Sequence, residues 1–396
     1  MALKAVHVSD VPHLDQVPGN AALSVRSPQF SKCVNEDENE KCGYKFPKFV
    51  VIGHRGSGMN MLQSSDGRMK SIKENSIRSF NNAASFPIDF IEFDVQGLGP
   101  GMAARLVTKD DCPVIFHDNF ILSGDKGAIV EKRVAEITLD EFLSFGPQME
   151  PENMGKSLFR KTKDGRIFEW KVEKDDPLCT LQEAFQKVNH SVGFNIELKF
   201  DDQIVYKEEE LTHILQVILR VVFEHAKGRP IIFSSFQPDA ALLVRKLQGT
   251  YPVFFLTNGG SEIYSDVRRN SLDEAINLCL AGGLQGIVSE VRAIFRNPGA
   301  VARIKESKLA LTTYGQLNNV PEVVYMQHLM GVEGVIVDLV QEITEAVSDL
   351  TGPTKEGKEE KNFFEEEGMV EVKTRPQFSK DELSFLMKLI PELIQP

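Results

Sequence analysis

Hydrophobic and polar residues alternate in the centre of the stretch 89–96, and this alternation predicts a β-strand. One face of the strand carries Phe90, Glu92 and Asp94, and the other carries Ile91, Phe93 and Val95. Two carboxylates at positions i and i+2 are costly to bury unless something compensates their charge. A divalent cation is the simplest compensation, because hard cations such as Mg²⁺ and Ca²⁺ take carboxylate oxygens as ligands. Taken alone, such a pair more often marks a solvated strand face, so its meaning depends on the rest of the chain.

Predicted strands and amphipathic helices alternate over most of the sequence. A strand at 49–53 precedes a helix at 74–84, in which Ile77, Phe80 and Ala84 form one stripe. Capping-box spacings that begin at Thr138 and Thr180 predict two further short helices. Later strands are predicted at 193–199, 230–235, 252–256, 286–290, 309–314 and 334–338, and helices at 209–226, 238–247, 271–281, 298–307 and 321–330.

This inventory contains eight strands, nearly all followed by a helix, and it predicts a TIM (β/α)₈ barrel. The runner-up is an open, doubly wound α/β sheet, which the same alternation permits. A ninth strand is predicted at 112–118. No helix fits between Gln96 and Cys112, so we expect this strand to fold back antiparallel on 90–95 as a hairpin.

The remaining segments lack this regularity. Residues 1–47 are predicted to be an irregular extension that is a candidate transit segment, although acidic residues argue against that role. The barrel is expected over 48–350, with a long excursion at 146–178 that has no clear period. A charged linker is predicted at 351–378, followed by an amphipathic helix at 379–396 that docks on the barrel or on a partner.

Composition narrows the class of function. The 396-residue chain has a net charge of −12, which argues against binding to nucleic acid or to anionic membrane surfaces. No apolar run approaches the roughly 20 residues that span a bilayer. The five cysteines form no C-x-x-C pair, and we interpret them as reduced thiols. Nothing in the pattern predicts an oligomeric state.

Polar side chains collect at the carboxyl ends of the predicted strands, where barrel enzymes have their active sites. The candidates are His54 and Arg55, Glu92 and Asp94, His117, and Glu197 with Lys199. Three carboxylates could hold a cation, two imidazoles could transfer protons, and Arg55 with Lys199 could bind an anion. Each residue alone has a structural explanation that is more common, so it is their combination that predicts a site.

Five spaced motifs in this order resemble the glycerophosphodiester phosphodiesterase family. They are His54-Arg55-Gly56, Glu74-Asn75-Ser76, Glu92-Phe93-Asp94-Val95, Phe116-His117-Asp118 and Asn195-Ile196-Glu197-Leu198-Lys199. The resemblance continues through 234–236 and 331–338, and covers roughly 49–345. The amino-acid sequences of 240–247 and of the C-terminus are similar to those of a plant branch of this family, which includes plastid members. A chloroplast location is therefore implied, with the cytoplasm as the alternative.

The resemblance implies a TIM barrel that hydrolyses glycerophosphodiesters, such as glycerophosphocholine and glycerophosphoethanolamine, to sn-glycerol 3-phosphate and an alcohol. It also implies Mg²⁺ or Ca²⁺ as cofactor and a small-molecule substrate. The implied roles are general acid and base for His54 and His117, and metal ligands for Glu92, Asp94 and Glu197. Arg55 and Lys199 would hold the phosphate, with Asn75 as a lesser contact.

Three positions depart from the family pattern. Ser76 replaces a threonine, residues 312–318 replace a Trp-containing strand, and a Gly/Pro-rich insert occupies 97–106. The insert raises an alternative, in which His117 is displaced and the barrel is an impaired binding or scaffold protein. A phospholipase-type enzyme acting on intact lipid is a second alternative. A carboxylate-pair glycosidase is less favoured, because it would not need the two histidines and two cations together.

Overall fold

The computed structural model describes residues 44–97, 111–125, 128–148, 155–162 and 164–351. The predicted linker and C-terminal helix lie outside the described residues, apart from Thr351. Most of the N-terminal extension and all of the 97–106 insert except Gly97 also lie outside them. Among the described residues, no helix combines the length and the apolar composition that a membrane span requires.

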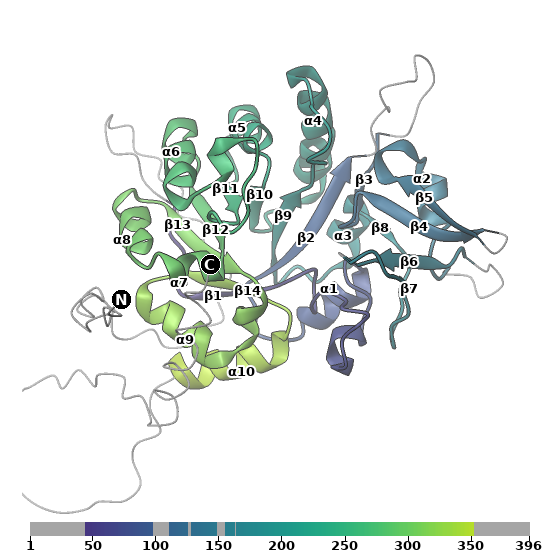
Figure 1. Ribbon diagram of the computed structural model, residues 1–396, viewed down its shortest axis with the longest axis horizontal. Coiled ribbons are helices and arrows are strands. Elements are labelled where there is room, and N and C mark those ends of the chain that lie inside the picture. The colour runs from purple at the N-terminus through teal and green to yellow at the C-terminus, as the bar shows by residue number, and fades with distance from the viewer. Residues whose placement is uncertain (1–43, 98–110, 126–127, 149–154, 163, 352–396) are drawn as a thin grey trace, which may run out of the picture.

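Eight parallel strands close into a barrel, as the sequence predicted (Figure 1). They are β1 (Val50–Gly53), β2 (Phe90–Gly97), β9 (Gly193–Leu198), β10 (Ile231–Ser235), β11 (Val253–Thr257), β12 (Gly286–Glu290), β13 (Ala310–Tyr314) and β14 (Gly334–Val337). The first strand pairs with both β14 and β2, with Val51 opposite Val335 and Ile52 opposite Phe90. This double pairing closes the barrel and excludes the open sheet.

Helices cover the outside of the barrel (Figure 1). They are α1 (Ile77–Ala83), α3 (Leu181–Lys187), α4 (Glu208–His225), α5 (Pro238–Leu247), α6 (Leu272–Gly282), α7 (Val291–Arg296), α8 (Gly299–Glu306), α9 (Pro321–Met330) and α10 (Val340–Thr351). The outward residues Ile91, Phe93 and Val95 of β2 are fully buried in the core between strands and helices. Apolar burial on both faces is the usual environment of a parallel strand.

The inward face of the barrel changes from apolar to charged along β2. Phe90 lies in an interior cluster with Val50, Ile52 and Phe254. Phe46, which precedes the first strand, fills this end, with its ring centroid 6.1 Å from that of Phe90. Glu92 and Asp94 follow on the same face toward the carboxyl end. Aromatic rings thus close one end of the barrel, and the charged groups line the other.

The predicted hairpin strand is present as β3 (Pro113–Ile115), which is shorter than the expected 112–118. It runs antiparallel to β2, with Val95 opposite Ile115. The amide of Phe116 then donates to the carbonyl oxygen of Asp94 at 3.0 Å. The 97–106 insert therefore does not displace the segment that carries His117. On its other edge β3 pairs with the short β8 (Cys179–Thr180).

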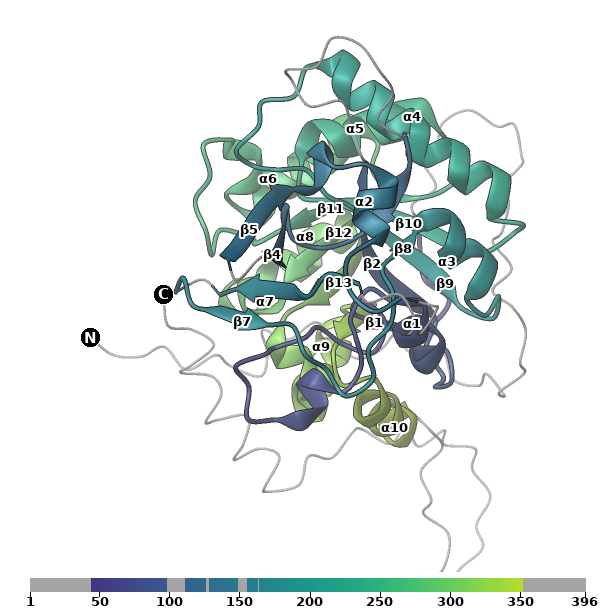
Figure 2. The same ribbon diagram turned by 90° about the vertical axis from the view of Figure 1, so that its right-hand side faces the viewer.

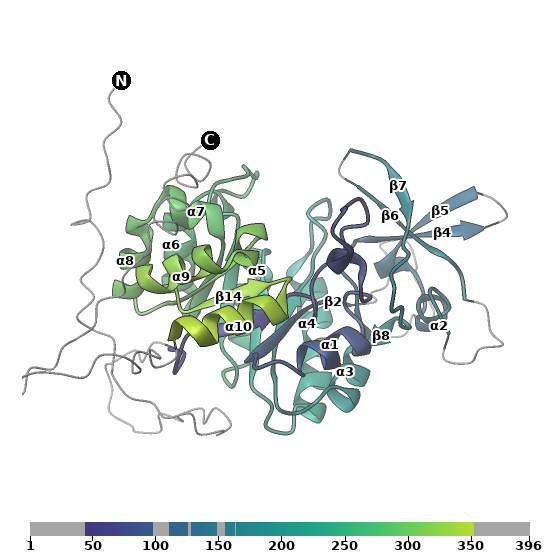
Figure 3. The same cartoon turned by 90° about the horizontal axis from the view of Figure 1, so that it is seen from below.

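A second, antiparallel sheet was not predicted. It contains β4 (Phe120–Asp125), β5 (Ala128–Arg133), β6 (Leu158–Lys161) and β7 (Ile167–Glu169) in the order β5-β4-β6-β7. Its strands are short and half exposed, so they lack the apolar runs that marked the barrel strands. With α2 (Leu139–Leu143) it packs around a small core that includes Phe116, Phe142 and Trp170. Figures 1 and 3 show this inserted sheet to one side of the barrel, and in Figure 2 it faces the viewer.

The first helix begins later than predicted, at Ile77 rather than Glu74. Ser76 is its N-cap, and the Ser76 hydroxyl accepts a hydrogen bond from the amide of Ser79. Asn75 precedes it with φ +54°, a left-handed conformation that cannot continue into a helix. Glu74 and Asn75 therefore belong to a turn. That turn presents both side chains to the charged end of the barrel.

Candidate functional site

Three carboxylates meet at the carboxyl ends of β2 and β9. Asp94 and Glu197 are direct neighbours in the pairing of these strands, and Glu92 lies two residues before Asp94. The structure brings one oxygen of each of Glu92, Asp94 and Glu197 within 4.8 Å of the others. All three are buried, with 2%, 1% and 9% of their surface exposed. The alternation in both strands and their parallel register produce this cluster.

The hydrogen bonds that these three carboxylates accept do not fully compensate their negative charge. Oε2 of Glu92 accepts from the amide of Arg55 at 2.9 Å, whereas the buried Oε1 has no hydrogen-bond partner. Burial and the neighbouring charge of Asp94 raise the pKa of Glu92. Carboxylate oxygens grouped in this way are the donor set that hard divalent cations prefer. The site therefore fits a divalent metal ion.

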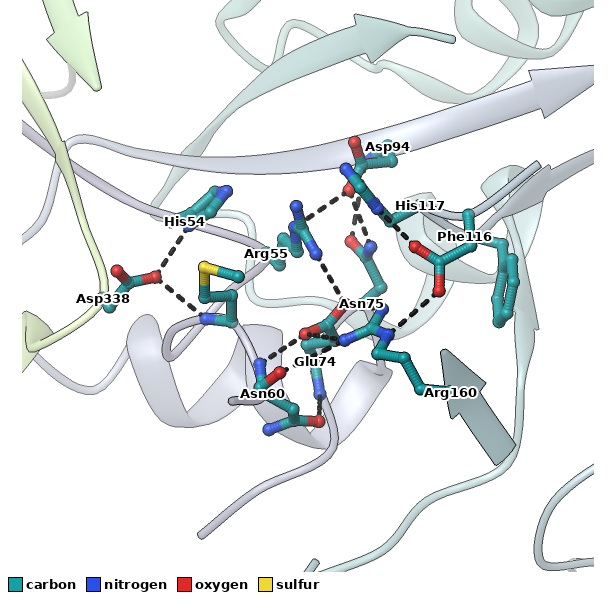
Figure 4. Close-up of polar contacts among 12 residues, drawn as sticks. His54, Arg55, Asn60, Glu74, Asn75, Asp94, Phe116, His117, Arg160 and Asp338 are labelled. Carbon is teal, nitrogen blue, oxygen red and sulfur yellow. Dashed lines mark hydrogen bonds and ion pairs between the residues drawn. The ribbon is translucent and has the colours of Figure 1, made fainter. Parts of the chain in front are cut away.

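Two cations, Arg55 and Lys199, border the carboxylates. Figure 4 shows Arg55 beside Asp94. Nε of Arg55 lies 3.3 Å from Oδ2 of Asp94, and Nζ of Lys199 lies 2.9 Å from Oε1 of Glu197 and 3.6 Å from Oδ1 of Asp94. Burial raises the pKa of Asp94, but His117, Arg55 and Lys199 together hold it below its ordinary value. These two cations make this end of the barrel suited to an anionic ligand.

The two histidines stand on either side of this cluster. Nε2 of His54 lies 3.9 Å from Oε2 of Glu92, while its Nδ1 lies 2.7 Å from Oδ1 of Asp338. Burial lowers the pKa of His54, but the charge and hydrogen bond of Asp338 raise it, and the net direction is upward. Nδ1 of His117 lies 2.7 Å from Oδ1 of Asp118. Burial lowers the pKa of His117, as do Arg55 and Lys199.

Asn75 joins the site through its side chain. Its Nδ2 donates to Oδ2 of Asp94 at 2.8 Å, and its amide donates to the carbonyl oxygen of Arg55. Arg55 also has a positive φ, of 49°. Both residues therefore hold strained backbone conformations at the same site. All eight residues singled out from the sequence converge on this end of the barrel.

The sequence analysis did not identify the three acidic residues that hydrogen-bond to the two histidines and to Arg55. Asp118 and Asp338 each bond to a histidine, and Glu74 receives a hydrogen bond from NH1 of Arg55 at 2.7 Å. All three lie in segments that the motifs contain, so adjacency to the motif residues was an available signal. Arg160 of the inserted sheet bonds to two of these acids, and no signal in the sequence pointed to it.

A cavity of about 520 Å³ opens beside Lys199. Its lining includes the aromatic residues Phe200 and Tyr206, the start of α4, and Gln96 and Asn119. This cavity lies between the end of β9 and α4, and Lys199 is the one residue of the candidate site among its described lining residues.

Comparison with known proteins identifies relatives over the whole chain. A model described as the glycerophosphoryl diester phosphodiesterase family matches residues 54–342. The glycerophosphodiester phosphodiesterase GDPD1, chloroplastic, of Arabidopsis thaliana is 57% identical over 396 residues, which is 100% of both chains. The Arabidopsis thaliana glycerophosphodiester phosphodiesterase GDPD3 is 59% identical over 93% of this chain and 97% of its own.

A solved structure agrees with the fold. The Oleispira antarctica phosphodiesterase, determined in complex with the product sn-glycerol-3-phosphate, superimposes with a TM-score of 0.52 at 19% identity. The match covers 76% of this chain and 97% of that one.

Proposed function

Because the chain belongs to the glycerophosphoryl diester phosphodiesterase family, we propose that it hydrolyses glycerophosphodiesters at the charged end of its barrel. It is a glycerophosphodiester phosphodiesterase, and glycerophosphocholine and glycerophosphoethanolamine are the substrates we expect. The products are sn-glycerol 3-phosphate and the alcohol. The observation that carries the proposal is the buried trio of Glu92, Asp94 and Glu197, bordered by two cations and two histidines.

Glu92, Asp94 and Glu197 would hold the divalent cation, which we propose to be Mg²⁺ or Ca²⁺. When bound, such a cation stabilises the negative charge that develops on phosphate oxygens during hydrolysis. The unpartnered Oε1 of Glu92 supports this assignment, because a buried carboxylate oxygen without a partner is costly.

Arg55 and Lys199 would bind the phosphodiester. The guanidinium can donate to two phosphate oxygens, and the ammonium adds a point charge beside them. Both groups already lie against carboxylates, at 3.3 Å and 2.9 Å, so little rearrangement is needed when charge increases on the substrate. Asn75 orients Asp94 through its 2.8 Å hydrogen bond.

His54 and His117 would carry the two proton transfers. One takes a proton from the attacking oxygen and the other gives one to the leaving alkoxide. Each ring is oriented by a carboxylate at 2.7 Å from Nδ1, which leaves Nε2 to face the reaction. The attacking oxygen is that of water, or the 2-hydroxyl of the substrate's own glycerol acting through a cyclic intermediate.

The test is release of glycerol 3-phosphate from glycerophosphocholine by the purified chain, with Mg²⁺, with Ca²⁺ and with chelator. We expect metal-dependent turnover that falls by about 10²- to 10⁴-fold in His54→Ala and in His117→Ala. His190→Ala is the matched control, because His190 is exposed and lies near the opposite end of β9. An inactive wild-type chain, or histidine variants with normal turnover, would overturn the proposal.

We place the protein in the chloroplast, as the resemblance implied. The chloroplastic Arabidopsis thaliana relative matches this chain over its full length, including residues 1–47. A fusion of these residues to a fluorescent protein should collect in plastids. A diffuse cytoplasmic signal from both this fusion and the full-length fusion would contradict the assignment.

A further inference from the structure

Arg160 lies outside the barrel, on β6 of the inserted sheet, yet its guanidinium reaches two acids behind the site (Figure 4). Nε donates to Oδ2 of Asp118 at 2.9 Å. NH2 donates to Oε1 of Glu74 at 2.7 Å, and NH1 donates to Oε2 of Glu74 at 3.0 Å. Only 12% of the Arg160 side chain is exposed. One buried guanidinium therefore uses three nitrogens on two carboxylates.

Each of these acids also contacts a different functional group of the site. The Oδ1 atom of Asp118 is 2.7 Å from Nδ1 of His117. The Oε1 atom of Glu74 accepts from NH1 of Arg55 at 2.7 Å. Arg160 therefore takes part in two short series of polar contacts, one through Asp118 and one through Glu74. One series ends at a histidine proposed to transfer a proton, and the other ends at the arginine proposed to bind phosphate.

The position of Arg160 is itself fixed. Its guanidinium carbon lies 3.8 Å from the ring centroid of Trp170, and the indole Nε1 donates to Oδ1 of Asn60 at 2.9 Å. The amide of Asn60 donates in turn to Glu74. A cation stacked on an aromatic face and bound to two carboxylates has little freedom to move.

The charges of the network also favour arginine. Burial raises the pKa of both Glu74 and Asp118, but the charge of Arg160 holds each below its ordinary value, and Arg55 contributes as well. A lysine has one compact ammonium and cannot bind both carboxylates with the same planar geometry. Removing the guanidinium would leave Asp118 without its main cation and would leave Arg55 as the remaining ion-pair partner of Glu74.

We propose that Arg160 is a positioning residue that couples the orientation of His117 to that of Arg55. This inference rests on the proposed function of those two residues. It assigns the inserted sheet a part in the reaction, because that sheet supplies the group that aligns the proton-transfer and phosphate-binding sides of the site. A purely structural ion pair would stabilise the fold without changing kcat or KM.

The experiment compares Arg160→Met with Arg166→Met in the full chain. Arg166 precedes β7 on the same hairpin, but it is 66% exposed and pairs with Asp164. We expect folded Arg160→Met to lose about 10- to 100-fold in kcat, as when other outer partners of site residues are removed. KM for glycerophosphocholine should also rise, because Arg55 is less well held. Arg166→Met should match the wild type in both.

Introducing Arg160→Met into the His117→Ala variant tests whether Arg160 acts through His117. In His117→Ala, Arg160→Met should lower kcat little further, because the imidazole that it orients is already absent, while KM still rises. Full, additive loss of kcat in the double variant would show that Arg160 does not act through His117. It would overturn the inference.

Chemical rescue separates positioning from folding. Guanidinium ion, at concentrations too low to unfold the chain, should restore part of the turnover of Arg160→Ala and none in Arg166→Ala. If the alanine and methionine variants do not fold, Arg160→Lys is the variant to measure. Full activity of Arg160→Lys would overturn the inference. Normal kcat and KM in folded Arg160→Met would do the same. Failure of the proposed function is distinguishable, because the wild-type chain would then be inactive.

Discussion

Nδ1 of His54 lies 2.7 Å from Oδ1 of Asp338, although 284 residues separate them in the chain. They lie just beyond the first and last strands of the barrel, which are neighbours only because the barrel closes. Asp338 is fixed in turn, since it accepts from the amide of Met59 and from Nδ2 of Asn319, each at 2.9 Å. The contact orients the imidazole so that its other nitrogen faces Glu92.

Asp338→Asn should lower the pKa of His54. The substitution removes the charge that raises this pKa and leaves the effect of burial, which lowers it. An NMR titration of the histidine ring protons in metal-free protein measures the change. The remaining histidines should keep their titration curves. An unchanged curve for His54 would contradict the assigned cause.

The same variant should lose stability in a pH-dependent way. Because the folded-state pKa of His54 is raised, the pair stabilises the fold below the unfolded pKa of about 6.5, and this gain disappears as pH rises through the folded value. We expect a loss of about 1 to 3 kcal/mol at about pH 5.5 and a smaller loss at about pH 8.5. Urea unfolding at both pH values checks the sign. A larger loss at the higher pH would refute it.

Glu92→Gln should stabilise the metal-free protein and remove its response to metal. Gln can still accept from the amide of Arg55, but it no longer adds a charge beside Asp94 and Glu197. In the wild type, metal at 100 times its Kd should raise the free energy of unfolding by about 2.7 kcal/mol. Thermal unfolding with chelator and with Mg²⁺ or Ca²⁺ measures both effects.

Glu290→Gln is the control for that prediction. Glu290 also ends a barrel strand, β12, but it is not part of the carboxylate cluster. Its variant should keep the full metal-induced rise in Tm. If Glu92→Gln kept that rise as well, Glu92 would not be a metal ligand.

Asn75→Gly and Asn75→Ala should separate the backbone from the side chain. Both lose the hydrogen bond to Asp94, so both should bind metal about 10- to 100-fold more weakly by calorimetry. Both variants must adopt φ +54° at this position, which strains alanine but not glycine, so the alanine variant should be less stable than the glycine variant by about 1 kcal/mol.

Lys308 provides the matched comparison for Asn75. It is exposed and has φ +56°, far from the carboxylates in sequence. Lys308→Ala and Lys308→Gly should differ in stability in the same direction and leave metal affinity unchanged. Equal metal affinity in wild type and Asn75→Gly would mean that the side chain does not support Asp94.

Phe46→Ala should destabilise the chain without impairing turnover. Phe46 is 4% exposed and packs in the barrel interior against Phe90 and Phe254, at the end opposite the site. Truncating a buried phenylalanine costs about 3 to 5 kcal/mol. Unfolding by urea measures the loss, and kcat at a temperature where the variant is folded should stay near the wild-type value. A large fall in kcat would show that the two ends are coupled.

The features of this protein that depend on local periodicity and on strand order could be predicted from the amino-acid sequence. The alternation at 90–95 put Glu92 and Asp94 on one face, and the same alternation at 193–199 put Glu197 and Lys199 on one face. Counting strands and helices then predicted the barrel, whose carboxyl end collects these side chains. The ordered motifs supplied the two histidines, Arg55 and Asn75.

The groups that hydrogen-bond to those residues from outside the site depend on long-range contacts in the folded chain. The contact between His54 and Asp338 exists because β1 pairs with β14, a long-range pairing that no local pattern encodes. The start of α1 was set by the left-handed backbone of Asn75, which composition does not reveal. Arg160 is the clearest case, because it lies on a short, half-exposed strand without a recognisable period. Its role depends on packing between the inserted sheet and the barrel, and that packing is fixed by three-dimensional contacts such as the stacking on Trp170.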